Sequence, residues 1–179
     1  AGRFCPKNSA SPIYCGSAAL FCPEGSGTVT SATPGSFTKP EGEEFALERS
    51  DEETCPAGFA CVGGEKIECV AGSTFQAQGG ESRCNPCSSC PLGSYISTTC
   101  SSTSDVECSS CPAGTWGDGS VQFCTDCQHG TFSSGDASVC LFCAAGEKPN
   151  GDKSGCTTCS PGTASGADEA TCASCPAGR

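Results

Sequence analysis

Large apolar side chains are sparse along this chain, and no segment holds the eighteen or more apolar residues that a membrane span requires. Leu, Ile, Val and Phe together number 22 of the 179 residues, well below the fifth that marks a chain poor in core-forming residues. Several of the aromatic side chains stand close to a cysteine, as Phe4, Tyr14 and Phe21 do. The pattern predicts short two-stranded excursions turned by glycine and little helix.

The regular feature of the chain is cysteine. From Cys108 onward, a Cys-x-x-Cys pair recurs every sixteen residues, and the pairs are Cys108/Cys111, Cys124/Cys127, Cys140/Cys143, Cys156/Cys159 and Cys172/Cys175. The third residue after each pair is glycine: Gly114, Gly130, Gly146, Gly162 and Gly178. Self-similarity at a fixed period indicates an array, and units this short are stable only when they stack on their neighbours.

Composition leads to the same conclusion. The chain has 20 cysteines, enough to be classed as a disulfide scaffold, and closing a loop of about fourteen residues stabilises a fold by roughly 3 kcal/mol. We therefore predict a small disulfide-rich repeat array, with short β-hairpin and loop modules stacked in an elongated rod. Because disulfides persist outside the reducing cytosol, we expect the protein to be secreted or on a cell surface. The last residues, from Cys175, begin another unit, which suggests an excerpt of a longer array.

Metal binding and redox chemistry are the alternatives for these cysteines. Pairs twelve residues apart come near zinc-ribbon spacing, but zinc sites use separate sets of four ligands, whereas this ladder has no natural grouping into fours. Redox Cys-x-x-Cys motifs occur once, near a βαβ pattern, and are not repeated on turns. We interpret the cysteines as structural, with no metal and no cofactor.

Five regions follow from the cysteine spacing: 1–22, an N-terminal Cys-rich segment; 23–54, an insertion without cysteine; 55–68, a Cys-rich connector; 69–108, a six-cysteine module; and 109–179, the sixteen-residue repeats. Residues 23–40 alternate Ser and Thr with Pro, a composition typical of an extended or O-glycosylated stretch, although an undecorated loop or edge strand fits equally well. The candidate O-glycosylation sites are Thr28, Thr30, Ser31, Thr33, Ser36 and Thr38.

Residues 41–53 hold seven acids against Arg49, and this run is the one candidate helix. Pro40 suits a first helical position, and Glu43 and Glu44 would be favourable at the positive end of the helix dipole. A carboxylate cluster of this kind can also bind calcium, but the alternating Asp/Asn pattern of a calcium loop is missing. A solvated acidic face is the default interpretation, and we expect residues 23–54 to form an arm, a packed flap or a glycan-bearing segment.

The segment from Cys69 to Cys108 resembles a cysteine-rich domain of the tumour-necrosis-factor receptor family. The resemblance rests on Cys87-x2-Cys90-x9-Cys100-x7-Cys108, together with Pro91, Gly93 and Tyr95. It implies the bridges Cys69–Cys84, Cys87–Cys100 and Cys90–Cys108, the last two interlocked.

The later units resemble the cysteine-rich repeats of Eph-receptor ectodomains and of protist and algal surface proteins such as flagellar-hair (mastigoneme) proteins. The shared motif is Cys-x-x-Cys-Pro-x-Gly-Thr-aromatic, with Trp116 and Phe132 at the aromatic position and Lys148 and Ala164 in their place further on. The resemblance implies the bridges Cys111–Cys124, Cys127–Cys140, Cys143–Cys156 and Cys159–Cys172. Six cysteines remain unassigned, and sequence alone leaves their pairing open: Cys5, Cys15, Cys22, Cys55, Cys61 and Cys175.

Catalysis and nucleic-acid binding have little support. His129, the one histidine, stands at a turn position where other units have Ala113 or Pro161, and no nucleophile motif surrounds any serine. Nine basic residues against twenty acids make a surface that repels phosphate. Asn8, Asn85 and Asn150 lie in no Asn-x-Ser/Thr sequon, so N-glycosylation is not expected.

Two function classes remain. The favoured one is structural: part of a surface coat, stalk or filament such as a flagellar hair. The alternative is a ligand-binding ectodomain of a receptor or adhesin, with residues 69–108 as the contact module. Phe123, Leu141 and Phe142 lie beside or between cysteines, where a stapled hairpin has little room to cover them. They are the candidate interface, and we expect homotypic contacts in an open-ended assembly, with O-linked glycans as a further candidate feature.

Overall fold

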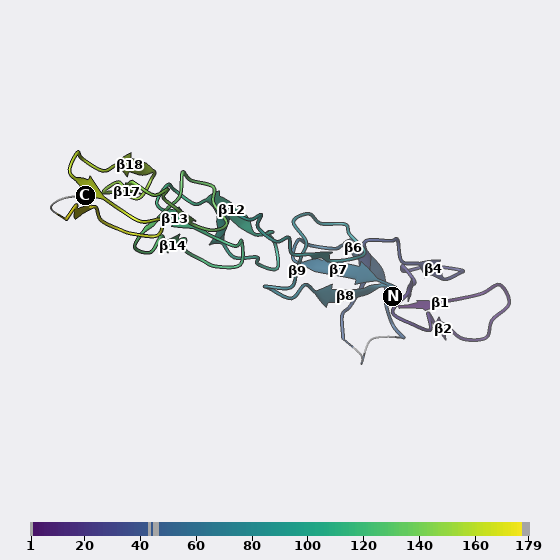
Figure 1. The fold of residues 1–179 in the computed structure, drawn as a ribbon. Helices are drawn as coiled ribbons and strands as arrows, with labels where there is room; N and C mark the ends of the chain where they lie inside the picture. Colours follow the sequence, from purple (N-terminus) through teal and green to yellow (C-terminus); the bar gives the residue numbers. More distant parts are fainter. Residues whose placement is uncertain (1, 43, 45–46, 177–179) are drawn as a thin grey trace. The chain divides into compact units, whose positions relative to one another are not determined.

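The computed structural model describes residues 2–42, 44 and 47–176. In this part of the chain there is no α-helix, and every strand pairs with a sequence neighbour in an antiparallel two-stranded hairpin. Nine disulfides tie the hairpins together. The protein is a small disulfide-rich array of hairpin modules, in agreement with the predicted fold class (Figure 1).

Each module is built on the same tight turn. In the unit that begins at Cys111, the Thr115 N–H donates to the Pro112 carbonyl at 3.1 Å, and Gly114 between them has a φ of +83°. A turn closed in this way, with positive φ at its third residue, is a type II turn, which explains why glycine occupies that position. The corresponding glycines also have φ between +79° and +84°: Gly35, Gly58, Gly72, Gly93, Gly130, Gly146 and Gly162. Gly178 lies outside the described residues.

A second backbone bond closes the base of most modules. The N–H of the cysteine after the hairpin donates to the carbonyl of the turn glycine, for example from Cys127 to Gly114 at 2.9 Å and from Cys159 to Gly146 at 2.8 Å. Cys55 N–H makes the same bond to Gly35 at 2.9 Å. The turn and its closure are therefore independent of the side chains that vary between modules.

The chain divides into two compact units, and the first consists of residues 1–87 and 100–105. Its strands are β1 (Arg3–Phe4), β2 (Ile13–Tyr14), β3 (Leu20–Phe21), β4 (Thr30–Ser31), β5 (Ser36–Lys39), β6 (Asp51–Thr54), β7 (Phe59–Val62), β8 (Glu65–Glu68), β9 (Thr74–Phe75) and β10 (Asn85–Pro86). The longer hairpins β5–β6 and β7–β8 pack on each other, and a parallel bridge joins Phe37 to Gly64. Phe37, Cys55 and Cys61 are buried between them, with Phe59 packed alongside.

The helix expected over residues 41–53 is wrong. Asp51–Thr54 form β6, which pairs with β5 in the register Phe37 to Glu53 and Lys39 to Asp51. Glu53 also makes an ion pair with Lys39 on the neighbouring strand. Pairing with the partly buried strand β5 outweighs the weak helix preference of this acidic run, and Asp51 and Glu53 stay exposed. Residues 43, 45 and 46 lie outside the described part of the chain.

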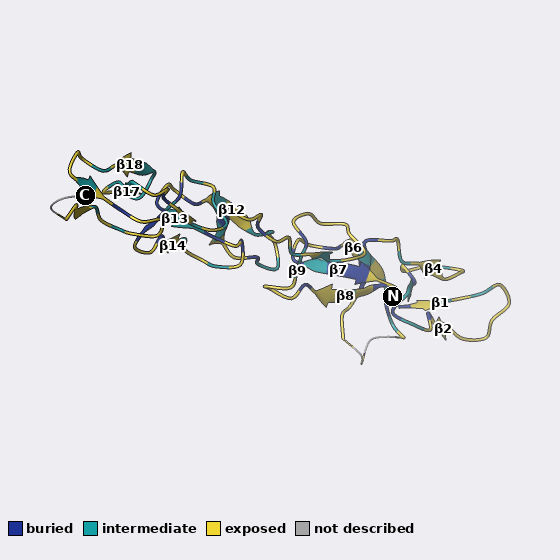
Figure 2. Cartoon of the chain, in the orientation of Figure 1, coloured by how far each residue is buried: buried dark blue, intermediate teal, exposed yellow. Residues whose placement is uncertain are grey.

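The second unit consists of residues 88–99 and 106–179. Its strands are β11 (Ser94–Thr98), β12 (Glu107–Ser110), β13 (Thr115–Trp116), β14 (Thr125–Asp126), β15 (Thr131–Phe132), β16 (Leu141–Phe142), β17 (Glu147–Pro149), β18 (Cys156–Thr158), β19 (Thr163–Ala164) and β20 (Ala173–Ser174). Among its described residues, the fully buried side chains are cysteines, Cys111 and Cys127, and most of the surface is exposed or half-buried (Figure 2).

Hairpins of the second unit contact the next hairpin and also the one after it. The Gly114 N–H donates to the Ser133 carbonyl of the next hairpin at 2.9 Å. A side chain on Gly114 would overlap the carbonyl oxygen of Asp152, and one on Gly130 would overlap that of Asp168, both two hairpins further on. Glycine is therefore needed at these two positions for close packing as well as for the turn.

Candidate interaction surface

The disulfides form two groups, those that the family resemblances imply and those that they do not. Seven bridges lie between residues 69 and 172, and they are the seven pairs that the family resemblances imply. The other two, Cys15–Cys22 and Cys55–Cys61, each close a short loop in the first unit and could not be assigned from sequence. Cys5 and Cys175 are free thiols with exposed side chains.

The bridges use eighteen of the twenty cysteines, and among the described residues only Cys5 and Cys175 keep a thiol. One group of potential metal ligands lies close together there, Cys87, Cys100 and Asp105, but the two cysteines are bonded to each other. In the repeats, each bridge joins consecutive Cys-x-x-Cys pairs rather than the two cysteines within a pair. The geometry is that of a structural staple and not that of a tetrathiolate site.

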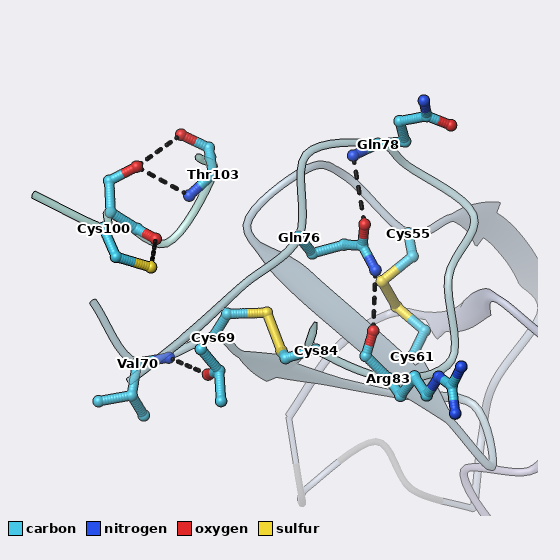
Figure 3. Close-up of a disulfide and its surroundings, with 12 residues drawn as sticks. Cys55, Cys61, Cys69, Val70, Gln76, Gln78, Arg83, Cys84, Cys100 and Thr103 are labelled. Atoms are coloured by element: carbon cyan, nitrogen blue, oxygen red, sulfur yellow. Dashed lines mark hydrogen bonds between the residues drawn. A yellow bond between two sulfur atoms is a disulfide. The ribbon is translucent and has the colours of Figure 1, made fainter. Parts of the chain in front are cut away.

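Buried amides and hydroxyls fix the loops around the bridges in the first unit. Gln76 is 4% exposed, and its Nε2 donates to the Arg83 carbonyl at 2.8 Å, between the Cys55–Cys61 and Cys69–Cys84 bridges (Figure 3). Its backbone also contributes, since the Gly58 N–H donates to the Gln76 carbonyl at 2.8 Å. Gln76 was not singled out from sequence, because nothing in its neighbourhood distinguishes it from a surface glutamine.

Arg49 has a structural role that could not be recognised from the acidic sequence around it. It is 4% exposed, and its guanidinium donates from Nη1 to the Thr38 carbonyl at 3.0 Å and to the Pro40 carbonyl, and from Nη2 to the Gly42 carbonyl at 3.1 Å. The side chain thus holds the start of the acidic loop against β5. A small cavity of about 280 Å³ opens beside it, with Phe37 and Lys66 in its lining.

The candidate glycosylation sites differ sharply in accessibility. Thr38 is fully buried, and its hydroxyl donates to the Ala18 carbonyl at 2.6 Å, so its assignment as an O-glycosylation site is wrong for the folded chain. Ser36 is half-buried in β5, and Thr33 donates its hydroxyl to Glu52 at 2.7 Å. Thr28, Thr30 and Ser31 are exposed and remain the accessible candidates.

The three residues of the candidate interface are all exposed: Phe123 by 78%, Leu141 by 57% and Phe142 by 59%. Val139, which the sequence analysis did not include, is equally exposed at 59% and stands just before Cys140. Three of these apolar side chains therefore flank one Cys-x-x-Cys segment, in which Leu141–Phe142 form β16. In a repeat held by bridges, the short strand between two cysteines has both of its residues pointing away from any core.

A groove of about 490 Å³ lies in the same unit, between β11 and the segment that ends at Phe123. Its walls include Tyr95, Ile96 and Gln122. The segment follows the edge of β11, since the Ile96 N–H donates to the Val121 carbonyl at 2.8 Å and the Gly119 N–H to the Ser94 carbonyl at 3.0 Å. The groove combines the apolar side chains Tyr95, Ile96 and Phe123 with the polar side chains of Ser97, Thr98, Thr99 and Gln122.

The charged side chains of the described surface act locally. Ser120 donates from both its hydroxyl, at 2.7 Å, and its N–H, at 2.9 Å, to Asp118, and these bonds lower the pKa of that carboxyl. Ser154 lowers the pKa of Asp152 in the same way. In the first unit, the hydrogen bond from Arg3 to Glu48 at 2.7 Å raises the pKa of the guanidinium. These interactions stabilise loops and involve no acid–base pair suited to catalysis.

His129 occupies the second position of the turn between Gln128 and Thr131 and is exposed, away from any nucleophile or buried carboxylate. It therefore remains a surface side chain.

Residues 69–108 match the family model of the TNFR/NGFR cysteine-rich region. The match covers the interlocked bridges Cys87–Cys100 and Cys90–Cys108 and the first hairpin of the second unit, β11–β12. No curated protein sequence matches the chain. In the described residues, no helix has the length and apolar character needed to cross a bilayer. The chain thus contains one tumour-necrosis-factor-receptor-like cysteine-rich module, of a kind that belongs to extracellular, disulfide-stapled ectodomains.

Proposed function

We propose that this chain is a structural component of an extracellular assembly such as a surface coat, stalk or filament. The observation that carries the proposal is the nature of the contacts between repeats. They are mainly backbone hydrogen bonds and close approaches of glycine to carbonyl oxygens, as between Gly114 and Ser133. Such contacts use mainly the backbone and need no large apolar side chains, so they allow units to be added for length. The receptor-like module, by comparison, occurs once.

The partner in this assembly is a second copy of the chain, and the contact surface is the set of exposed apolar residues Phe123, Leu141 and Phe142. A disulfide-stapled hairpin is rigid before it binds, so docking through it loses little conformational entropy. A contact between different surfaces of two copies leaves the assembly open-ended. O-linked glycans on Thr28, Thr30 and Ser31 belong to the same proposal, because these hydroxyls are accessible.

Sedimentation velocity over a range of concentrations tests the homotypic contact. The triple variant Phe123→Ser, Leu141→Ser and Phe142→Ser is expected to remove concentration-dependent association. Leu92→Ser is the matched control, because Leu92 is 71% exposed but lies outside the proposed surface, and it should associate like the natural chain. A natural chain that stays monomeric at all concentrations contradicts the proposal. Mass spectrometry of the native protein tests for hexose additions on residues 28–31.

The alternative function is that of a ligand-binding ectodomain. The groove beside β11 favours it, because the wall that includes Tyr95 and Ile96 lies within the family match, and Phe123 lines the other side. Under this alternative, Tyr95→Ala abolishes capture of a foreign extracellular protein and leaves self-association unchanged. Electron microscopy of the native material separates the two functions, since a structural component is present in many copies in a regular array.

A further inference from the structure

One position of the repeat joins neighbouring hairpins of the second unit. It lies three residues after the turn glycine and is occupied by Gly117, Ser133, Pro149 and Ser165. Ser133 makes three bonds there: its carbonyl accepts from the Gly114 N–H at 2.9 Å, its hydroxyl donates to the Thr115 carbonyl at 2.6 Å, and its N–H donates to the Lys153 carbonyl at 3.0 Å. The first two bonds reach the preceding hairpin and the third reaches the following one.

Pro149 cannot reproduce this set of bonds. Proline has no N–H and no hydroxyl, so two of the three bonds are lost with the residue type. The third is missing as well, because no bond joins the Gly130 N–H to the Pro149 carbonyl in the described part of the chain. Ser165, one repeat later, accepts from Gly146 at 2.9 Å and donates its hydroxyl to the Glu147 carbonyl at 2.6 Å.

We call the contacts between two neighbouring hairpins a joint and name each hairpin by the two cysteines that close it. The two joints of hairpin 127–140 differ in their hydrogen bonds. Both joints have the closing bond from the next cysteine N–H to the turn glycine carbonyl. Apart from it, four hydrogen bonds connect this hairpin to hairpin 111–124, including one from the Asp136 N–H to the Cys111 carbonyl at 2.9 Å and one from the Gly117 N–H to the Ala137 carbonyl at 3.0 Å. Among the described residues, two connect it to hairpin 143–156: the bond from Ser133 to Lys153, and one from the Lys153 ammonium to the Cys127 carbonyl. One of these two depends on a long, flexible side chain.

Side-chain packing weakens at the same place. Trp116 and Phe132 are half-buried in the hairpins before the joint, and the corresponding residue after it is Lys148, which is exposed. Two close approaches do span the joint, that of Gly114 to the carbonyl oxygen of Asp152 and that of Gly130 to the carbonyl oxygen of Asp168, but neither contact is a hydrogen bond. The hairpins that meet at Pro149 are thus held by fewer hydrogen bonds and less apolar contact than those that meet at Ser133.

We propose that Pro149 makes a hinge in the array, at which hairpins 111–140 and hairpins 143–172 bend relative to each other. Each bridge lies within a single hairpin, from Cys127 to Cys140 and from Cys143 to Cys156, so no disulfide crosses the joint, and the chain passes from one part to the other directly after β16. Bending at this point breaks no covalent link. The proposal does not depend on the function proposed above.

Amide hydrogen exchange by NMR tests the hinge directly, because exchange reports local opening. In the natural chain, the Gly130 amide is expected to exchange about fivefold faster than the Gly114 amide, as the loss of a net hydrogen bond implies. Pro149→Ser should restore the hydroxyl and N–H donors and slow Gly130 exchange by about fivefold. Pro112→Ser, which changes a proline of a turn outside the joint, should leave Gly130 unchanged.

Residual dipolar couplings supply the second measurement. Couplings from residues 111–140 and from residues 143–172 should require two different alignment tensors in the natural chain and one common tensor in the Pro149→Ser variant. Equal exchange at Gly114 and Gly130, or one common tensor for the natural chain, overturns the hinge. Both of these results come from the natural chain, so the test stands even if the serine variant does not fold.

Discussion

The centre of the first unit and the repeats of the second unit are stabilised in different ways. Around Phe37, side chains are packed together: the ring is 3% exposed, contacts Cys55 and Cys61, and has the Lys66 ammonium 4.6 Å from its centroid. In the repeats, the buried groups are cysteines, backbone and small hydroxyl side chains such as Ser133, and the aromatic Phe142 is 59% exposed. Where a region can bury an aromatic side chain, its stability depends on that residue type. Where it cannot, turn geometry and cross-links supply the stability instead.

The largest effect is expected from Phe37→Ala. Removing a buried phenyl ring costs about 4 kcal/mol through lost transfer free energy and the cavity that remains. Guanidinium denaturation with the disulfides intact, followed through amides of β5 and β7, measures it. Phe142→Ala is the control from the repeats and should change stability by no more than about 0.5 kcal/mol. Equal losses for the two variants would show that the repeats also have a packed core.

Gly114→Ala is expected to cost about 3 kcal/mol. The new Cβ meets a penalty for left-handed φ of about 1 to 2 kcal/mol, and its overlap with the Asp152 carbonyl oxygen adds a comparable strain. Gly162→Ala is the matched control, because Gly162 has φ +84° and nothing within 4 Å of the added Cβ, so only the φ penalty applies. Exchange of the Cys127 and Cys175 amides, which close the two hairpins, reports each loss locally. A difference below the error of the method would mean that the contact with Asp152 does not form.

Ser133→Ala should cost about 1 kcal/mol, because it removes the hydroxyl donor to the Thr115 carbonyl while leaving the backbone bonds in place. Protection of the Gly114 amide against exchange measures the change. Ser160→Ala serves as the control, since in that turn the backbone carbonyl of Ser160, not its hydroxyl, accepts a bond from Thr163. Unchanged protection in both variants would mean that backbone bonds alone hold the two neighbouring hairpins together.

The smallest effect is a pH dependence in the loop at Asp118. The bonds from Ser120 lower the pKa of this carboxyl in the folded chain, so its stabilising contribution is present above the unfolded pKa and is lost as pH falls through the folded pKa. Carbon-detected NMR titration should give a midpoint below the ordinary aspartate value, and Ser120→Ala should raise it. A midpoint that does not move in this variant would mean that the hydroxyl bond is absent in solution.

The repeats could be predicted in detail from the sequence because their chemistry is periodic. Cysteine spacing and the turn glycines, such as Gly114 and Gly130, depend on local backbone geometry, which a single sequence displays. The first unit was less predictable. The acidic strand Asp51–Thr54 has no β pattern of its own and forms because β5 supplies its partner, a contact that composition cannot reveal.

The candidate surface divides in the same way. Phe123 and Phe142 were expected to be exposed because a stapled hairpin has little interior, and both are. Thr38 was misassigned because a Ser/Thr-rich stretch gives no sign of which hydroxyl turns inward to meet Ala18. The bridges Cys15–Cys22 and Cys55–Cys61 could not be predicted from the sequence, since several connectivities satisfy the same spacing.

The positions of the bridges determine how the repeats respond to tension. A force applied along the chain passes from Cys111 directly to Cys124 through sulfur, then through two residues to Cys127, and so on. Each bridge spans a Cα–Cα distance of 5.6 to 5.8 Å in this series, and the linker adds roughly 10 Å, so a period of sixteen residues can lengthen to only about 16 Å, against roughly 55 Å for an unbridged chain. Pulling can therefore unfold every hairpin, but it cannot extend the residues that lie between two bridged cysteines. The force that this segment withstands before it lengthens further is set by its covalent bonds. A reducing agent would break the bridges and allow each period to extend fully.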